Sequence, residues 1–257
     1  FCAIPTLSCG ACPKCVTGLS AFCTNGSRAI GLGPAPGALA EYVAVSPHNL
    51  VKLPDGVDSE HGALVEPLAV GLHAVNVARV RPGEAALVMG AGPVGLAVVL
   101  WLRHLGVGTI VVSEKAEGRR AVAERLGATE AVAPSGVLPA VQRHARDGID
   151  VVFEATGVPG LIAQGMSSAA FRGRVVVVGV CNHPDTIFPL AGILKEATVH
   201  FVLAYELADF RYAVDMLDQG RIDPSPMVTD RIGFAEVPAM FETLAQPTTQ
   251  AKVLIVP

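Results

Sequence analysis

The chain has 257 residues, of which 51% are hydrophobic, 5% aromatic and 16% charged, and its formal net charge is −4. A net negative charge supplies no basic field for nucleic acid, so we expect no partner of that class. The length suffices for one large domain or two small ones. The many small apolar residues and the 27 glycines favour an α/β protein with a buried parallel sheet.

The uncharged stretch of residues 85–102 is the one candidate for a membrane span. Its centre holds Gly90, Gly92, Pro93 and Gly95, and its two halves are typical of a strand and a helix, which predicts a buried unit instead. The chain opens at Phe1 without a charged, apolar and small-residue signal pattern. We therefore expect no membrane partner and a cytoplasmic location.

Four of the six cysteines crowd into the pattern C-x2-C-x2-C-x7-C, and these are Cys9, Cys12, Cys15 and Cys23. Four thiolates from one short loop can surround a tetrahedral Zn²⁺ and leave no open position, so the site would be structural. The alternative is a disulfide pair in a secreted protein, against which the missing signal segment and the two further cysteines weigh. Those two, Cys2 and Cys181, are expected to be ordinary small buried residues.

Short strands are expected at residues 39–45 and 50–52, and a helix is expected to start near Glu60. In that helix Glu66 stands among apolar neighbours and directly before Pro67. A buried carboxylate is costly unless it is paired or bound to a metal, and the simpler alternative is an exposed glutamate at a helix break. The residues alone slightly favour that alternative, and they predict that His73 is a hydrogen-bonded core residue.

Gly90, Gly92 and Gly95 form the pattern G-x-G-x-x-G between an apolar run and a run compatible with a helix. Gly90 would allow the tight turn, Gly92 the close approach of a phosphate, and Gly95 close packing of helix on strand. A pyrophosphate suits the unpaired N–H groups at a helix start, although such turns also occur without a ligand.

A short β-branched strand at residues 109–114 ends in Glu114, which lies 19 residues after Gly95 (114 − 95). A dinucleotide fold places there the carboxylate that accepts from the adenosine ribose hydroxyls. Because a carboxylate repels a 2′-phosphate, NAD is favoured over NADP. Three cations close by, at Lys115, Arg119 and Arg120, leave NADP as an alternative.

Helices and strands then alternate along the chain, which predicts a doubly wound parallel sheet. Helices are expected at residues 117–126, 139–146, 161–170 and 207–217, and strands at 130–132, 149–154, 174–180, 186–190 and 252–256.

Taken together, these features resemble the zinc-dependent medium-chain alcohol and polyol dehydrogenases. The Cys9–Cys23 loop is similar to the structural zinc lobe of that family. The segment Leu64-Val65-Glu66-Pro67-Leu68 resembles its sorbitol and 2,3-butanediol dehydrogenase branch, and Gly90–Gly95 with Glu114 resembles its NAD site. The resemblance extends to residues 251–254 and so covers essentially the whole chain.

The resemblance implies a doubly wound parallel (Rossmann) sheet together with the remaining part of a GroES-like, β-rich catalytic domain. The domain bounds would be 1–67 for the catalytic domain with the zinc lobe, 68–203 for the NAD-binding domain, and 204–257 for the return to the catalytic domain. The family transfers hydride between a secondary alcohol or polyol and NAD, with a catalytic zinc as Lewis acid. The best guess for the substrate is 2,3-butanediol, and sorbitol and threonine are alternatives.

The resemblance also assigns site residues. Glu66 would be catalytic, and it would hold the catalytic zinc directly or through a water. Cys9, Cys12, Cys15 and Cys23 would hold the structural zinc. The NAD would be bound by Gly90, Gly92, Pro93, Val94, Gly95, Glu114, Arg119, Val178, Gly179, Val180 and Lys252.

Further expectations concern partners and activity. Residues 186–190 resemble the edge through which two nucleotide domains pair in the family, so a homodimer or homotetramer is expected. The family's first catalytic-zinc ligands lie upstream of the zinc lobe and have no counterpart here, which suggests the C-terminal part of a longer enzyme. We therefore expect this chain to bind NAD without turnover. The alternative from another class is a non-catalytic NAD-binding module with structural zinc only.

Overall fold

The computed structural model describes residues 1–246 and 248–256. By internal contacts the chain divides into two compact units, Phe1–His73 with Leu203–Arg221, and Ala74–Val202 with Ile222–Pro257. The bounds proposed from sequence divide the chain differently, because they follow a resemblance rather than contacts, and they stay a prediction. Among the described residues, no helix has both the length and the apolar character that a membrane crossing requires.

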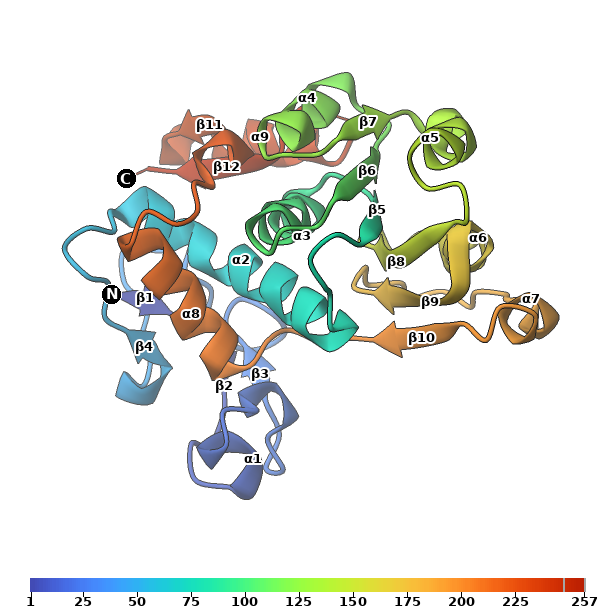
Figure 1. The fold of residues 1–257 in the computed structure, drawn as a ribbon. Coiled ribbons are helices and arrows are strands. Elements are labelled where there is room, and N and C mark those ends of the chain that lie inside the picture. The colour runs from blue at the N-terminus through green and yellow to red at the C-terminus, as the bar shows by residue number, and fades with distance from the viewer. Residues whose placement is uncertain (247, 257) are drawn as a thin grey trace. The chain divides into compact units, whose positions relative to one another are not determined.

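A parallel sheet in the order β10-β9-β8-β5-β6-β7 organises the second unit (Figure 1). The chain starts at the central β5, runs outward to β7 and then crosses back to β8, which is the doubly wound topology. The predicted fold class is therefore confirmed. The strands are β5 (Ala85–Met89), β6 (Thr109–Ser113), β7 (Glu130–Val132), β8 (Ile149–Glu154), β9 (Ala169–Val177) and β10 (Thr198–Phe201).

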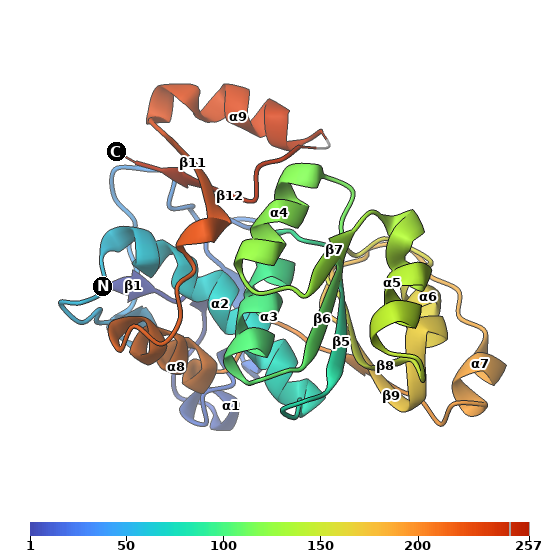
Figure 2. The same ribbon diagram turned by 45° about the horizontal axis from the view of Figure 1, so that its top comes forward.

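Helices cover both faces of this sheet, with α3 and α4 on one face and α5 and α6 on the other (Figure 2). The remaining elements of the unit are a short helix α7 before β10 and, after residue 222, a two-stranded parallel ribbon with helix α9. The bounds are α3 (Pro93–His104), α4 (Glu117–Arg125), α5 (Val137–His144), α6 (Leu161–Ser168), α7 (Pro189–Ile193), β11 (Val228–Ile232), α9 (Val237–Leu244) and β12 (Lys252–Ile255).

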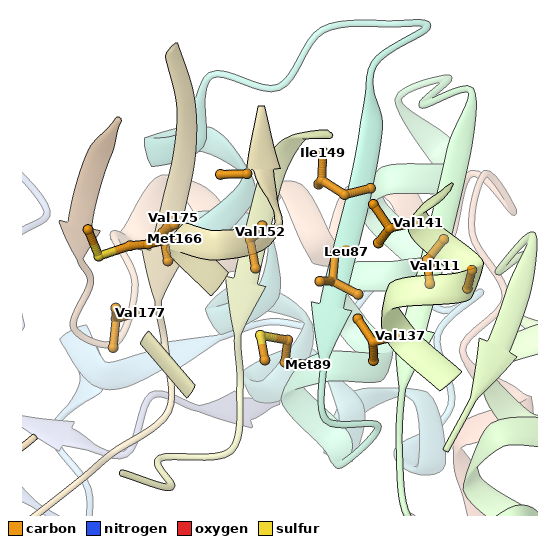
Figure 3. Packing of buried hydrophobic residues seen from close by; sticks show 12 residues of the cluster. Leu87, Met89, Val111, Val137, Val141, Ile149, Val152, Met166, Val175 and Val177 are labelled. Carbon is orange, nitrogen blue, oxygen red and sulfur yellow. The ribbon is translucent and has the colours of Figure 1, made fainter. Parts of the chain in front are cut away.

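The core under α5 and α6 follows the two-residue period of the strands. Leu87 and Met89 on β5, and Val175 and Val177 on β9, lie in one buried cluster. Figure 3 shows these side chains between the sheet and the two helices, whose contributions are Val137, Val141 and Met166. Val88 points to the other face, where its Cγ1 lies 3.5 Å from the position of a Cβ on Gly95 of α3.

The carboxyl ends of four central strands stand in register. Met89 pairs with Ser113 and with Glu154, and Glu154 pairs with Val177. The turns that follow these strands therefore meet at one edge of the sheet, where an open α/β sheet binds its ligands.

The first unit has only short strands and two longer helices, α2 and α8. His73 Nδ1 on α2 lies 2.9 Å from Asp209 Oδ2 on α8, which confirms that His73 is a hydrogen-bonded core residue. The bounds are β1 (Cys2–Ala3), β2 (Thr6–Leu7), α1 (Pro13–Val16), β3 (Arg28–Ala29), β4 (Leu50–Val51), α2 (Ser59–Ala78) and α8 (Leu207–Asp218).

Two expected strands are absent from the described residues. Residues 39–45 form no strand and Tyr42 is 90% exposed, because alternation yields a strand only where a neighbouring strand supplies hydrogen bonds. Residues 186–188 are irregular, and Pro189 begins α7, a position that suits proline since it needs no N–H there.

Replacing Gly95 should destabilise the second unit, since a Cβ on it would lie 2.0 Å from the Gly90 carbonyl oxygen. For Gly95→Ala we expect a loss of about 1–3 kcal/mol in the free energy of unfolding, measured by urea unfolding without cofactor. The matched control is Gly92→Ala, where a Cβ meets no atom within 4 Å. Equal losses in the two variants would contradict the packing role of Gly95.

Candidate functional site

The four clustered cysteines of the first unit form a cysteine lobe (residues 9–23) around a common centre. Their sulfur atoms all lie within 4.8 Å of one another, with Cys12 Sγ 3.4 Å from Cys15 Sγ and 3.9 Å from Cys23 Sγ. Four sulfurs held tetrahedrally at about 2.3 Å from zinc lie about 3.8 Å apart. The lobe therefore fits a structural zinc ion, and none of the six cysteines is paired in a disulfide.

Local backbone geometry produces this lobe. Gly10 and Gly18 adopt φ values of 70° and 87°, which glycine tolerates and other residues rarely do. The backbone N–H of Cys12 donates to Cys9 Sγ at 3.3 Å, and Leu207 N–H donates to the Gly18 carbonyl at 3.1 Å. The loop is thus shaped by its own turns and tied to the start of α8.

The pKa values of the lobe cysteines follow from hydrogen bonds with neighbouring residues, from burial and from the nearby sulfurs. A hydrogen bond from the Thr24 side chain lowers the pKa of Cys12 to about 5. At Cys15 a hydrogen bond with Ser8 acts to lower the pKa, but desolvation and the Cys12 sulfur outweigh it and raise the pKa to about 11. Neighbouring thiolates repel one another, and a bound cation removes that repulsion.

Glu66 lies in the interior of α2, which runs through Pro67 without a break. The expectation of an exposed glutamate at a helix break is therefore wrong, since Glu66 is only partly exposed. The buried apolar residues on either side of it keep the helix continuous at this point. Burial and the negative Glu66 raise the pKa of the Tyr205 hydroxyl. Burial, with a smaller contribution from Glu66, also raises the pKa of Cys2 to about 11.

Tyr205 is a residue that sequence reasoning missed. It is 6% exposed, and its hydroxyl has no hydrogen-bond partner in the part of the chain that the structure describes. A buried hydroxyl without a partner is costly, so this one suits a ligand or a water beside Glu66. A lone tyrosine before a helix carries no signal of this kind in the sequence.

The turn from β5 into α3 has the geometry that the glycine pattern predicts. Gly90 has a φ of 102°, Gly95 packs against its carbonyl, and Gly92 faces open space. Helix α3 begins at Pro93 with no side-chain cap, so its first N–H groups suit an anion. Val94 follows in the same first turn.

Glu114 reaches this turn from the end of β6. Its Oε2 accepts from Ala91 N–H at 2.8 Å and its Oε1 from Ala116 N–H at 2.9 Å. The carboxylate borders a hollow of about 420 Å³, lined by Glu114, Lys115, Ala116, Arg119, Thr248 and Thr249. Arg119 Nε donates to the Gln250 carbonyl at 2.7 Å, which fixes one wall of the hollow.

The other predicted cofactor residues lie in the same unit. Val178, Gly179 and Val180 follow β9 at the carboxyl edge of the sheet, and Lys252 begins β12. Their roles toward a cofactor stay predictions. Sequence reasoning missed Glu154 at this edge, although a charged residue ending the apolar strand Ile149–Glu154 was a visible signal.

Known proteins resemble the chain along its length. The zinc-binding dehydrogenase family matches residues 93–219 and the alcohol dehydrogenase GroES-like domain residues 2–55. The 2-dehydro-3-deoxy-L-galactonate 5-dehydrogenase of Pseudoalteromonas atlantica is 34% identical over 96% of this chain and 72% of that protein. The (R,R)-butanediol dehydrogenase of Bacillus subtilis is 34% identical over 89% of this chain and 66% of that protein.

A solved structure agrees with these relatives. A protein of Sinorhizobium meliloti 1021, described as a zinc-binding dehydrogenase and bound to NADP, has a TM-score of 0.88 at 32% identity and covers 100% of this chain and 76% of that chain. The chain therefore belongs to the zinc-binding medium-chain dehydrogenase family, among alcohol and polyol dehydrogenases.

Cys23→Ser should empty the cysteine lobe of metal, because a hydroxyl is a poor substitute for one of four thiolate ligands. We expect the zinc affinity to fall by more than about 100-fold, measured by competition with a chromophoric chelator. Cys181→Ser, which changes a cysteine outside the lobe, should leave the affinity unchanged. Equal zinc affinity in the two variants would contradict the assignment.

Proposed function

We propose that this chain acts in an NAD-dependent, zinc-dependent dehydrogenase that oxidises a secondary alcohol or a polyol, with 2,3-butanediol as the first candidate substrate. Sorbitol and threonine are the next candidates. The observation that carries the cofactor assignment is the held carboxylate of Glu114 beside the glycine turn. The family supplies the reaction type, hydride transfer at an alcohol carbon.

Glu114 supports NAD rather than NADP. Two backbone N–H groups fix its carboxylate at the end of β6, where ribose hydroxyls can donate to it and a 2′-phosphate would be repelled. Two nearby cations already donate to backbone carbonyls, Arg119 to Gln250 and Arg120 to Glu114 and Lys115. These hydrogen bonds occupy part of the donor capacity of both guanidinium groups, which weakens the case for a site that binds the 2′-phosphate of NADP.

The residues around Glu66 fit the substrate end of such a reaction. A catalytic zinc, when bound, polarises the substrate oxygen and lowers the pKa of its hydroxyl. Glu66 would hold the ion directly or through a water, and the unpartnered Tyr205 hydroxyl would orient the oxygen of a substrate or water. In the described residues the only group of three or more His, Cys, Asp or Glu placed to share a metal is the cysteine lobe.

The alternative function is a non-catalytic NAD-binding module with structural zinc only. It is supported by that same distribution of ligands, since the cysteine lobe is the one group of three or more such ligands that the described residues bring together. A second zinc would exclude the module, because the module binds about one zinc per chain and a completed enzyme about two, whereas one zinc is compatible with both functions.

We expect this chain to bind NADH with about one zinc per chain and to show no turnover. The measurements are metal content by mass spectrometry, NADH titration by fluorescence, and NAD reduction with butanediol, sorbitol and threonine. The same chain carrying Cys23→Ser, which disrupts only the lobe, controls for the zinc count. Absence of NADH binding would contradict the proposed function, and a second zinc with turnover would contradict the module.

Glu114→Ser should weaken NAD binding by about tenfold, since hydrogen bonds to a charged group contribute about 1.5–3 kcal/mol. It should also narrow the preference for NAD over NADP, measured by titrating both cofactors. Glu117→Ser, an exposed glutamate in the first turn of α4, is the matched control. An unchanged ratio of NAD to NADP affinity in Glu114→Ser would count against the ribose role.

A homodimer or homotetramer also belongs to the proposal. β10 is an edge strand of the parallel sheet, and Phe188 and Phe201 near this edge are 68% and 74% exposed. A second copy would cover both an unpaired strand edge and these aromatic side chains.

A further inference from the structure

Glu154 is a buried carboxylate at the centre of the sheet for which the proposed function supplies no role. It ends β8, is 2% exposed, and stands in register with Met89 and Val177. No ion pair joins it to a Lys, Arg or His within residues 1–246 and 248–256. A carboxylate buried without a cation requires hydrogen bonds in place of water.

Its hydrogen bonds hold the backbone on two sides. Oε1 accepts from the N–H of Thr156 at 2.8 Å and of Gly157 at 2.9 Å, and from the Thr156 hydroxyl. The backbone carbonyl of Glu154 accepts from Val178 N–H at 2.8 Å and from Gly179 N–H at 2.9 Å. One residue therefore fixes both the turn after β8 and the segment after β9.

These segments are in direct backbone contact. A Cβ on Gly157 would lie 2.2 Å from the Val180 carbonyl oxygen, and one on Gly179 would lie 2.1 Å from Gly157 N and 2.7 Å from Glu154 Oε2. The carboxylate thus lies where the two segments meet without a gap, so a shift of the turn must move residues 178–180 as well.

We propose that Glu154 is a positioning residue for the cofactor: without touching it, the carboxylate holds the turn at Thr156 and Gly157, and that turn packs against residues 178–180, along which the nicotinamide end would lie. The proposal rests on the proposed function and on the family resemblance, which implies that those three residues lie beside the nicotinamide. The adenosine end depends on Glu114 and the hollow beside it, and among the described residues no hydrogen bond joins Glu154 to Glu114 or to the lining of that hollow. Because the turn at Thr156 also lies against Gly90, we expect the nicotinamide end to respond more strongly than the adenosine end.

Glu154→Gln tests this role, because it keeps the size of the side chain and removes its charge. ADP-ribose, which lacks the nicotinamide, is titrated beside NADH. We expect the Kd of NADH to rise by about tenfold and the nicotinamide fluorescence change on binding to shrink, while the Kd of ADP-ribose stays within about twofold. Glu130→Gln, which alters a carboxylate paired with Arg143 and His144 in the same unit, should change neither Kd.

Equal weakening of NADH and ADP-ribose, or no change in either, would overturn the positioning role. Thr156→Val removes the hydroxyl that donates to Glu154 and that accepts from Val158 N–H at 3.3 Å, and it should weaken NADH binding selectively by about threefold. If Glu154→Gln fails to show a cooperative thermal transition, the binding of NADH and ADP-ribose by Thr156→Val tests the positioning role instead. An unaltered chain that binds ADP-ribose but not NADH would overturn the nicotinamide placement and this role, and one that binds neither ligand would refute the proposed cofactor site itself.

Discussion

The contact between Gly95 and the Gly90 carbonyl sets the geometry on which the nucleotide-binding unit depends. It brings the first turn of α3 directly against the end of β5, closer than any side chain would allow. The helix start then points its free N–H groups over the carboxyl edge of the sheet. Because Met89, Ser113, Glu154 and Val177 end in register there, every turn of the site is placed relative to that contact.

Backbone N–H groups, rather than cationic side chains, stabilise the two carboxylates of the site. Glu114 and Glu154 each receive hydrogen bonds from backbone N–H groups, and neither is joined to a cation by an ion pair in the part of the chain that the structure describes. Backbone donors hold a carboxylate at a fixed place without a mobile side chain. In the proposed dehydrogenase, this leaves one carboxylate to face the ribose and the other to hold the nicotinamide side.

The sequence predicted the parts of the structure that depend on local pattern. The strands at residues 130–132 and 149–154 have the expected bounds, because apolar period and turn residues determine them nearby. The prediction of a strand at residues 39–45 was wrong, since a strand depends on a neighbouring strand that the sequence pattern does not supply. The expectation of a helix break at Pro67 was also wrong. Helix α2 continues through this residue, because the buried packing of the helix outweighs the local cost of proline.

The candidate site was predictable to the extent that its chemistry lies in short motifs. The spacing of the cysteines in Cys9–Cys23 and of the glycines in Gly90–Gly95 predicts the geometry of both motifs. Tyr205 could not be found that way, because its significance is a buried hydroxyl beside Glu66, and the two are brought together only by folding. The position of Glu154 at the end of an apolar strand was visible in the sequence, but its bonds to both neighbouring segments form only on folding.

All four ligands of the cysteine lobe come from a span of 15 residues (23 − 9 + 1), whereas its hydrogen bond from Leu207 joins it to a distant part of the chain. Closing so short a loop costs little conformational entropy, and zinc binding supplies free energy of its own. The lobe can therefore acquire its metal on a nascent chain, long before residue 207 is synthesised.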